Sequence, residues 1–230
     1  MWISALFGLS TKYAESVLAV KYREVNENGE MCGGPMYAMK NGFKIKWIGL
    51  VLAFFFSLFT VFASFGIGNM TQANSIAESM AGLWGTPHWL TGAVIALLAL
   101  SILIGGIKSI GRVCGFFVPK MAVFYFVMGI AVIYMNRANL GQGIAMIFKM
   151  GLSPRAVAGG VGGTIVSGLF SSMRWGIARG IFSNEAGLGS APIVAAAAKT
   201  DHPSRQGYIN MTGTFFDTLV VCSVTGLIVA

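Results

Sequence analysis

Long apolar runs alternate with short polar segments along most of the chain. Residues 47–68 and 89–107 carry no charged side chain at all. Because a helix needs about 20 apolar residues to cross the hydrocarbon core of a bilayer, we expect both runs to be membrane-spanning helices. The pattern predicts further spans at 2–20, 113–135 and 211–230.

Other regions show a different pattern. Residues 21–46 are polar and contain a Gly-Gly-Pro sequence, which predicts a loop. Residues 139–155 combine apolar side chains with Lys149 and Arg155, which predicts a short amphipathic helix on the membrane surface. Residues 156–198 are apolar but rich in glycine and interrupted by charged residues, so we expect a broken helix there rather than a continuous one.

The composition agrees with a membrane protein. Only 10% of the 230 residues are charged, against about 25% in a typical soluble domain. The 16 Lys and Arg residues outnumber the 8 Asp and Glu residues, but they cluster between the apolar runs, which indicates membrane topology rather than nucleic-acid binding. We therefore predict an all-α, multi-pass protein of the cell membrane. It has one transmembrane domain over residues 1–230, with about six spans in the lipid bilayer.

Ionisable side chains inside the expected spans are the first candidates for function. Asp217 lies within the last span, where a carboxylate is costly unless it serves an ion path or has a buried partner. Both interpretations remain open, and the possible partners are Arg174, Arg179 and Lys199. Lys12 and Glu15, three residues apart, could pair on one face of the first span.

Glycines and polar residues in apolar segments are the second kind of candidate. Transporters bind solutes at broken helices, where freed backbone groups bind ions and the charged ends of small molecules. The segment 159–176, rich in glycine and serine, fits that description, although close helix packing would also favour small residues. Gln72, with Asn69 and Asn74, could hydrogen-bond an amino acid or could form a helix end in water.

The sequence contains no catalytic constellation. His88 and His202 are far apart, and neither an HExxH nor a GxSxG motif occurs. We therefore expect neither enzymatic activity nor a cofactor. A channel would require a repeated ring of polar pore-lining residues, and the sequence shows none.

Several stretches combine glycine, polar and aromatic residues in a distinctive way. They are residues 2–8, 11–15, 22–24, 33–37, 65–70, 72–75, 178–192, 202–203, 206–207 and 216–218. In these stretches the chain resembles the alanine or glycine:cation symporter family. The Ser-Asn-Glu-Ala-Gly sequence at 183–187 is the most specific of them, and the resemblance extends over essentially the whole chain.

This resemblance implies a LeuT-like fold of five-plus-five inverted repeats. The spans would then be the second to fifth helices of the first repeat and the first two of the second, so the chain is expected to be a fragment. It would lack the first helix and the helices after the seventh. The implied function is sodium-coupled symport of alanine or glycine by alternating access in a bacterial or archaeal inner membrane. The alternatives are a proton-coupled amino acid transporter and an ion channel.

The resemblance, together with the polar and ionisable residues described above, gives two sets of expected site residues. The expected substrate-binding residues are Gln72, Ser167, Phe170, Ser171, Ser172 and Gly176. The residues expected to couple an ion or to form a gate are Asp217, Asn184, Glu185 and Asn69. Sodium enters as the co-transported ion, and the other expected partner is a small neutral amino acid.

Overall fold

The computed structural model describes residues 1–27, 29–66, 69–151 and 165–229, which form two compact units. The first unit comprises Met1–Ser57 and Gly129–Ala230, and the second comprises Leu58–Met128. Within the described residues, both units are helical apart from one two-stranded hairpin in the first. The prediction of a helical protein is therefore confirmed.

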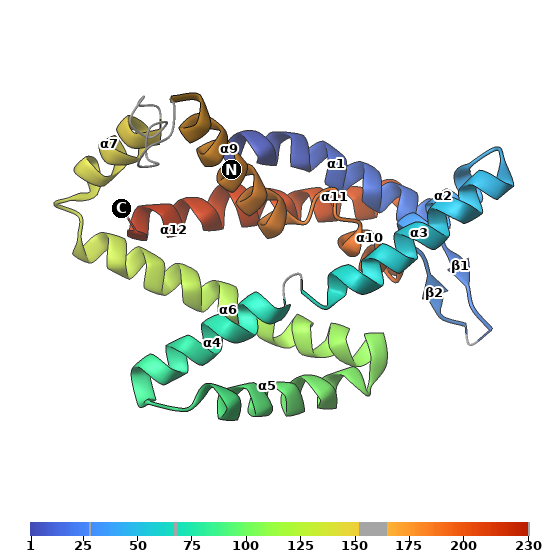
Figure 1. Cartoon of the computed structure of the whole chain (residues 1–230), viewed down its shortest axis with the longest axis horizontal. Helices are drawn as coiled ribbons and strands as arrows, with labels where there is room; N and C mark the ends of the chain where they lie inside the picture. Colours follow the sequence, from blue (N-terminus) through green and yellow to red (C-terminus); the bar gives the residue numbers. More distant parts are fainter. Residues whose placement is uncertain (28, 67–68, 152–164, 230) are drawn as a thin grey trace. The chain divides into compact units, whose positions relative to one another are not determined.

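The first unit contains most of the elements (Figure 1). They are α1 (Trp2–Lys21), β1 (Glu24–Val25), β2 (Met31–Cys32), α2 (Pro35–Gly42), most of α3 (Lys46–Ser64), the end of α6 (Gly106–Met135), α7 (Leu140–Gly151), α9 (Ile165–Asn184), α10 (Ser190–Ala196), α11 (Pro203–Thr214), η1 (Phe215–Val221) and α12 (Cys222–Val229). The bounds of the span predicted at 2–20 agree closely with those of α1, and the short helix predicted within 139–155 agrees with α7. Helix α1 is not among the described helices that are long and apolar enough to cross a membrane.

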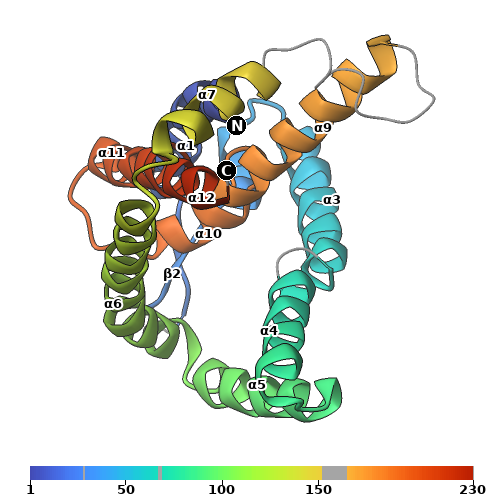
Figure 2. The same ribbon diagram turned by 90° about the vertical axis from the view of Figure 1, so that its left-hand side faces the viewer.

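Helix α1 packs along α11 and also contacts α9, α10 and η1 (Figures 1 and 2). Its buried residues recur mostly every three or four positions, which places them on one face of the helix. They are Ala5, Gly8, Lys12, Ser16, Ala19 and Val20. The approach of α11 is close, because a Cβ atom on Gly207 would lie 2.8 Å from the Tyr13 ring and from Val17.

Helices α11, η1 and α12 follow one another as a single helical run, drawn in red in both ribbon views. The run begins at Pro203, so the predicted start at residue 211 is wrong. Proline suits the first helical position because its ring fixes φ and its missing N–H needs no partner there. The Ser204 backbone N–H donates a 3.3 Å hydrogen bond to Nδ1 of His202, which caps the helix start.

The described residues of 21–46 include a two-stranded hairpin and the helix α2, so the prediction of a loop throughout this range is wrong. β1 and β2 pair antiparallel, with Glu24 opposite Cys32. Gly34 then adopts a φ of +127°, which a residue with a side chain rarely adopts, and the chain enters α2 at Pro35. The Gly-Gly-Pro sequence therefore marks the start of a short helix.

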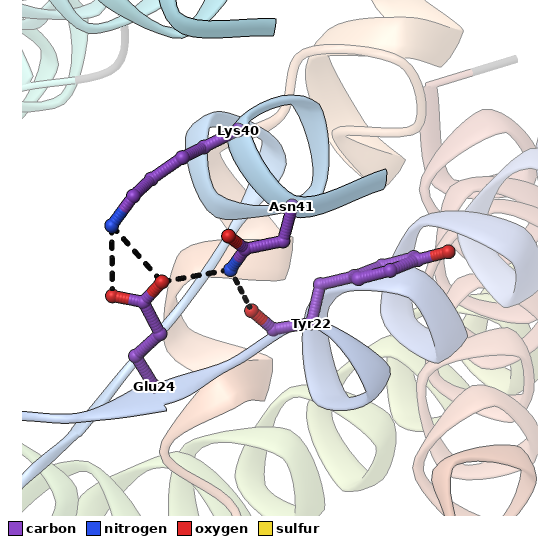
Figure 3. A network of polar contacts seen from close by, with 4 residues as sticks. All are labelled: Tyr22, Glu24, Lys40 and Asn41. Carbon is purple, nitrogen blue, oxygen red and sulfur yellow. Dashed lines mark hydrogen bonds and ion pairs between the residues drawn. The ribbon is translucent and has the colours of Figure 1, made fainter. Parts of the chain in front are cut away.

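Polar contacts join the end of α1 to α2 (Figure 3). The Glu24 carboxylate accepts hydrogen bonds from Lys40 Nζ at 3.0 and 3.1 Å and from Asn41 Nδ2 at 2.8 Å. Asn41 Nδ2 also donates to the Tyr22 carbonyl at 3.3 Å. The bond from Asn41 and the contact with Lys40 favour the charged carboxylate, so they hold the pKa of Glu24 below its ordinary value.

Helix α9 is one uninterrupted helix of 20 residues, contrary to the expectation of interruptions at its arginines. Arg174 and Arg179 are both exposed, so their charged groups reach the outside without a break in the backbone. The break expected within 156–198 occurs after α9, where Asn184 and Glu185 were also expected to interrupt the helix and where three residues have positive φ angles. They are Glu185 (55°), Gly187 (87°) and Gly189 (78°). The glycine-rich segment 159–164 lies outside the described residues.

The second unit consists of the end of α3, α4 (Asn69–Trp84), α5 (His88–Leu103) and the first part of α6. Helix α4 packs against α5. Helix α5 ends before the predicted residue 107, because the chain turns at Gly106, whose φ is +66°. The same glycine begins α6, so this helix starts earlier than the predicted residue 113.

Large apolar side chains are exposed in both units, as a lipid environment requires. Phe54, Leu97 and Phe124 expose 63%, 68% and 67% of their surfaces, which is unusual for a water-soluble protein. Three helical stretches of the described residues are long and apolar enough to cross a membrane. They lie within Lys46–Trp84, which includes the separate helices α3 and α4, at Ser109–Met135 and at Pro203–Val229, and the apolar helix His88–Leu103 is shorter.

Candidate functional site

A cavity of about 600 Å³ lies in the first unit among α1, the end of α9, α10, α11 and η1. We call it the polar cleft, because many of its lining side chains are polar. These polar residues are Lys12, Ser183, Asn184, Glu185, Gln206, Asn210, Thr214 and Asp217. One ammonium and two carboxylates thus line a single cavity in a protein whose surface is largely apolar.

Asp217 is held in the polar cleft by hydroxyl groups. Ser183 Oγ donates a 2.5 Å hydrogen bond to Asp217 Oδ2, and Thr218 Oγ1 donates to the same oxygen at 3.3 Å. Among the described residues, no ion pair joins Asp217 to the possible partners named from the sequence. Asp217 also sits in η1, a π-helical segment of a kind that occurs often at functional sites.

Asn184 ends α9 and is almost completely buried, with 5% of its surface exposed. Its Oδ1 atom accepts a 2.9 Å hydrogen bond from the Ala186 backbone N–H, so the side chain stabilises the turn that follows. Its own carbonyl oxygen accepts a 2.7 Å hydrogen bond from Lys12 Nζ. Asn184 therefore connects the turn to α1.

Glu185, the next residue, has a left-handed backbone conformation. Its φ is 55°, which few residues other than glycine adopt. It is exposed, and its Oε2 atom accepts a 3.0 Å hydrogen bond from Ser190 Oγ at the start of α10. Such a conformation persists only where the surrounding contacts support it, and it occurs often at functional sites. The contacts of Asn184 and Ser190 provide that support on the two sides of Glu185.

Polar side chains of α11 also line the polar cleft. Gln206 Nε2 donates to Asn210 Oδ1 at 3.1 Å, and Thr214 Oγ1 donates to the Asn210 carbonyl at 3.2 Å. These three residues and Ser183 are not among the site residues predicted from the sequence. Their spacing was a usable signal, because residues 206, 210 and 214 recur every four positions and so share one helix face with Asp217.

The structure places Asp217, Asn184 and Glu185 in the lining of the polar cleft. Asn69 and Gln72 belong to the second unit, where both are exposed on α4. The remaining candidates are on α9. The side chains of Ser167, Phe170, Ser171 and Ser172 lie outside the described part of the chain. Gly176 is described but does not line the polar cleft.

A larger cavity of about 920 Å³ lies in the first unit, next to α1, α2 and α3. Its lining is mostly apolar and includes Glu15, so Lys12 and Glu15 line different cavities. Within the described residues they form no ion pair, and the predicted pairing is wrong. The polar cleft is better suited to a small charged solute, because it offers charges of both signs and several hydrogen-bonding groups.

The comparison with known proteins covers the whole chain. A family model described as the sodium:alanine symporter family matches residues 1–230. The sodium/alanine symporter AgcS of Methanococcus maripaludis is 50% identical over 228 residues, which cover 99% of this chain and 49% of the relative.

Two proteins of Bacillus subtilis are also similar. The amino-acid carrier protein AlsT is 38% identical over 231 residues, and the probable sodium/glutamine symporter GlnT is 36% identical over 230 residues. Each match covers 100% of this chain, and the matches cover 47% and 45% of the relatives. The chain spans about half the length of the relatives it matches.

Proposed function

This chain belongs to the sodium:alanine symporter family, and we propose that the protein carries a small neutral amino acid across the cell membrane together with sodium. The family is one of transporters rather than enzymes, as the sequence analysis predicted. Alanine or glycine is the proposed solute, which agrees with the name of the sodium/alanine symporter to which the chain is 50% identical.

The observation that carries this proposal is the polar cleft in an otherwise apolar protein. Two carboxylates and one ammonium line it, so the charged side chains sum to a net negative charge that attracts cations. Hard cations prefer oxygen ligands, and the Asp217 carboxylate lies beside the Ser183 hydroxyl. We assign Asp217 to ion coupling on these grounds.

Asn184 and Glu185 are the proposed gate residues. They occupy the break between α9 and α10, where a change of a few backbone angles would alter access to the polar cleft. Asn69 is assigned to the same group by resemblance alone. The proposed substrate contacts are Gln72, Ser167, Phe170, Ser171, Ser172 and Gly176. A LeuT-like fold that works by alternating access completes the proposal.

The test is uptake of labelled alanine and glycine by the native protein reconstituted in proteoliposomes. The membrane potential is clamped while an inward gradient of sodium, of potassium or of protons is imposed. We expect concentrative uptake with the sodium gradient alone. Uptake driven by the proton gradient would favour the proton-coupled alternative, and uptake independent of every gradient would overturn the coupling.

A further inference from the structure

The chain segment that includes α1 contributes two cations to the region around the polar cleft. Lys12 Nζ donates a 2.7 Å hydrogen bond to the carbonyl of Asn184, the last residue of α9. Arg23 Nη1, just beyond α1, donates to the carbonyls of Ala196 and Ala198 at 3.1 and 2.7 Å, at the end of α10. Both cations therefore contact the C-terminal end of a helix.

Helix C-terminal ends are favourable places for a cation. The last carbonyl groups of a helix lack partners within the helix, and they carry a partial negative charge. Lys12 has only 7% of its surface exposed, so its ammonium depends on protein groups rather than on water. Its contact with Asn184 is thus a buried, charge-assisted hydrogen bond, which is stronger than a neutral one.

The turn between these two contacts carries Glu185. The chain leaves α9 after Asn184 and enters α10 at Ser190, and the residues between them include three with positive φ. Helix α1 also lies close to the end of α9, because a Cβ atom on Gly8 would lie 3.2 Å from Asn184 Nδ2. The position of Glu185 thus depends on where the end of α9 is held.

We propose that Lys12 is a positioning residue of the polar cleft. Its ammonium holds the end of α9 and thereby sets the position of the Glu185 carboxylate relative to Asp217. Arg23 holds the end of α10 in the same way. The consequence for transport rests on the proposed function, whereas the effect on the turn does not.

Hydrogen–deuterium exchange of the native protein in lipid nanodiscs tests the effect on the turn. Lys12→Met keeps the length of the side chain but removes the charge and the donor groups. We expect amide exchange at residues 185–189 to rise at least about tenfold, since a lost hydrogen bond to a charged group is worth more than that factor. Lys12→Arg, which keeps the cation, should stay near the wild type. The matched control is Lys21→Met, an exposed residue in the last turn of α1 that should leave this exchange unchanged.

Two further variants allow the test to be completed even if the Lys12→Met protein misfolds. Lys12→Gln keeps an N–H donor without the charge and should give a smaller rise at 185–189, so it decides the question if Lys12→Met does not fold. Arg23→Met should raise exchange at residues 196–200 and leave residues 185–186 unchanged. Unchanged exchange at 185–189 in both Lys12→Met and Lys12→Gln would overturn the proposal, as would an equal rise in every helix.

Transport kinetics provide the second readout. Lys12→Met should raise the sodium concentration that gives half-maximal uptake by at least about tenfold, because the Glu185 carboxylate no longer has a fixed position in the cavity that it lines with Asp217. A residue that only stabilises the fold would lower the maximal rate and leave that concentration unchanged, which would overturn the positioning role in transport. If wild-type uptake does not depend on sodium, the proposed function fails, while the exchange data still decide the role of Lys12.

Discussion

Asn210 Nδ2 donates a 2.7 Å hydrogen bond to Ser16 Oγ, which joins α11 to α1 across 194 positions of sequence. Ser16 is completely buried, and its hydroxyl donates in turn to the Lys12 carbonyl at 2.7 Å. Where water is absent, buried polar groups must satisfy one another. This pair therefore fixes the relative position of two helices that line the polar cleft.

Replacing Ser16 by alanine should destabilise the protein. The variant removes the acceptor of the Asn210 amide, which is only partly buried, so the loss of this hydrogen bond should cost about 0.5–1.5 kcal/mol. Reversible unfolding in mixed detergent micelles measures the free energy of unfolding. The control is Ser101→Ala, because the hydroxyl of Ser101 bonds only within its own helix and is exposed. Equal stability of the two variants would contradict the importance of the contact between helices.

Two glycines of α11 should respond differently to alanine. A Cβ atom on Gly207 would lie 2.8 Å from Tyr13 and Val17, and Tyr13 is itself packed against Tyr208 with ring centroids 5.1 Å apart. Gly207→Ala should therefore cost about 1–3 kcal/mol by overpacking. Gly213 has no such neighbour within 4 Å among the described residues, so Gly213→Ala should not lower the free energy of unfolding. A loss of stability in Gly213→Ala as large as in Gly207→Ala would show that the close approach of α1 is not the cause.

The network around Glu24 should make the junction between α1 and α2 sensitive to acid. The hydrogen bond from Asn41 and the contact with Lys40 lower the pKa of Glu24 in the folded protein. The stabilisation is therefore complete above the ordinary pKa of a glutamate, and it is lost as the pH falls through the lowered value. Asn41→Ala should raise the pKa of Glu24, as followed by carbon NMR of the labelled carboxylate. The control is Asn136→Ala, because the Asn136 amide bonds to the Val132 carbonyl at the end of α6, far from Glu24 in the sequence, and its loss should leave the titration unchanged.

The apolar runs predicted much of the fold but little of its tertiary contacts. The predicted helix at 47–68 corresponds to α3, because a long uncharged run has few alternatives to a helix in lipid. The start of α11 was missed because a cap and a proline decide it, whereas the apolar pattern begins later. The charges of Arg174 and Arg179 do not predict the continuity of α9, because both side chains are exposed and leave the helix intact.

The candidate site could be predicted only in part, because most of its residues are brought together by contacts between helices that are distant in the sequence. Asp217 stood out because a carboxylate in an apolar run is costly. Its partner Ser183 lies 34 positions away in the sequence, and no local pattern connects the two. The buried face of α1 was available in principle, because its residues recur at helical spacing. Only the packed helices show that Lys12 contacts a backbone carbonyl rather than Glu15.

Asp217→Asn should separate the ionic role of this residue from its structural one. Asparagine keeps the size of the side chain and an oxygen that accepts a hydrogen bond from Ser183, but it removes the negative charge. We therefore expect normal expression and folding, with at least about a tenfold rise in the sodium concentration for half-maximal uptake, equivalent to about 1.4 kcal/mol. Sodium titration of alanine uptake in proteoliposomes measures this change. The control is Asp201→Asn, which removes a carboxylate from an exposed ion pair with Arg205 and should leave uptake unchanged. If Asp217→Asn lowers transport only in proportion to the amount of folded protein, the carboxylate stabilises the fold and does not couple the ion.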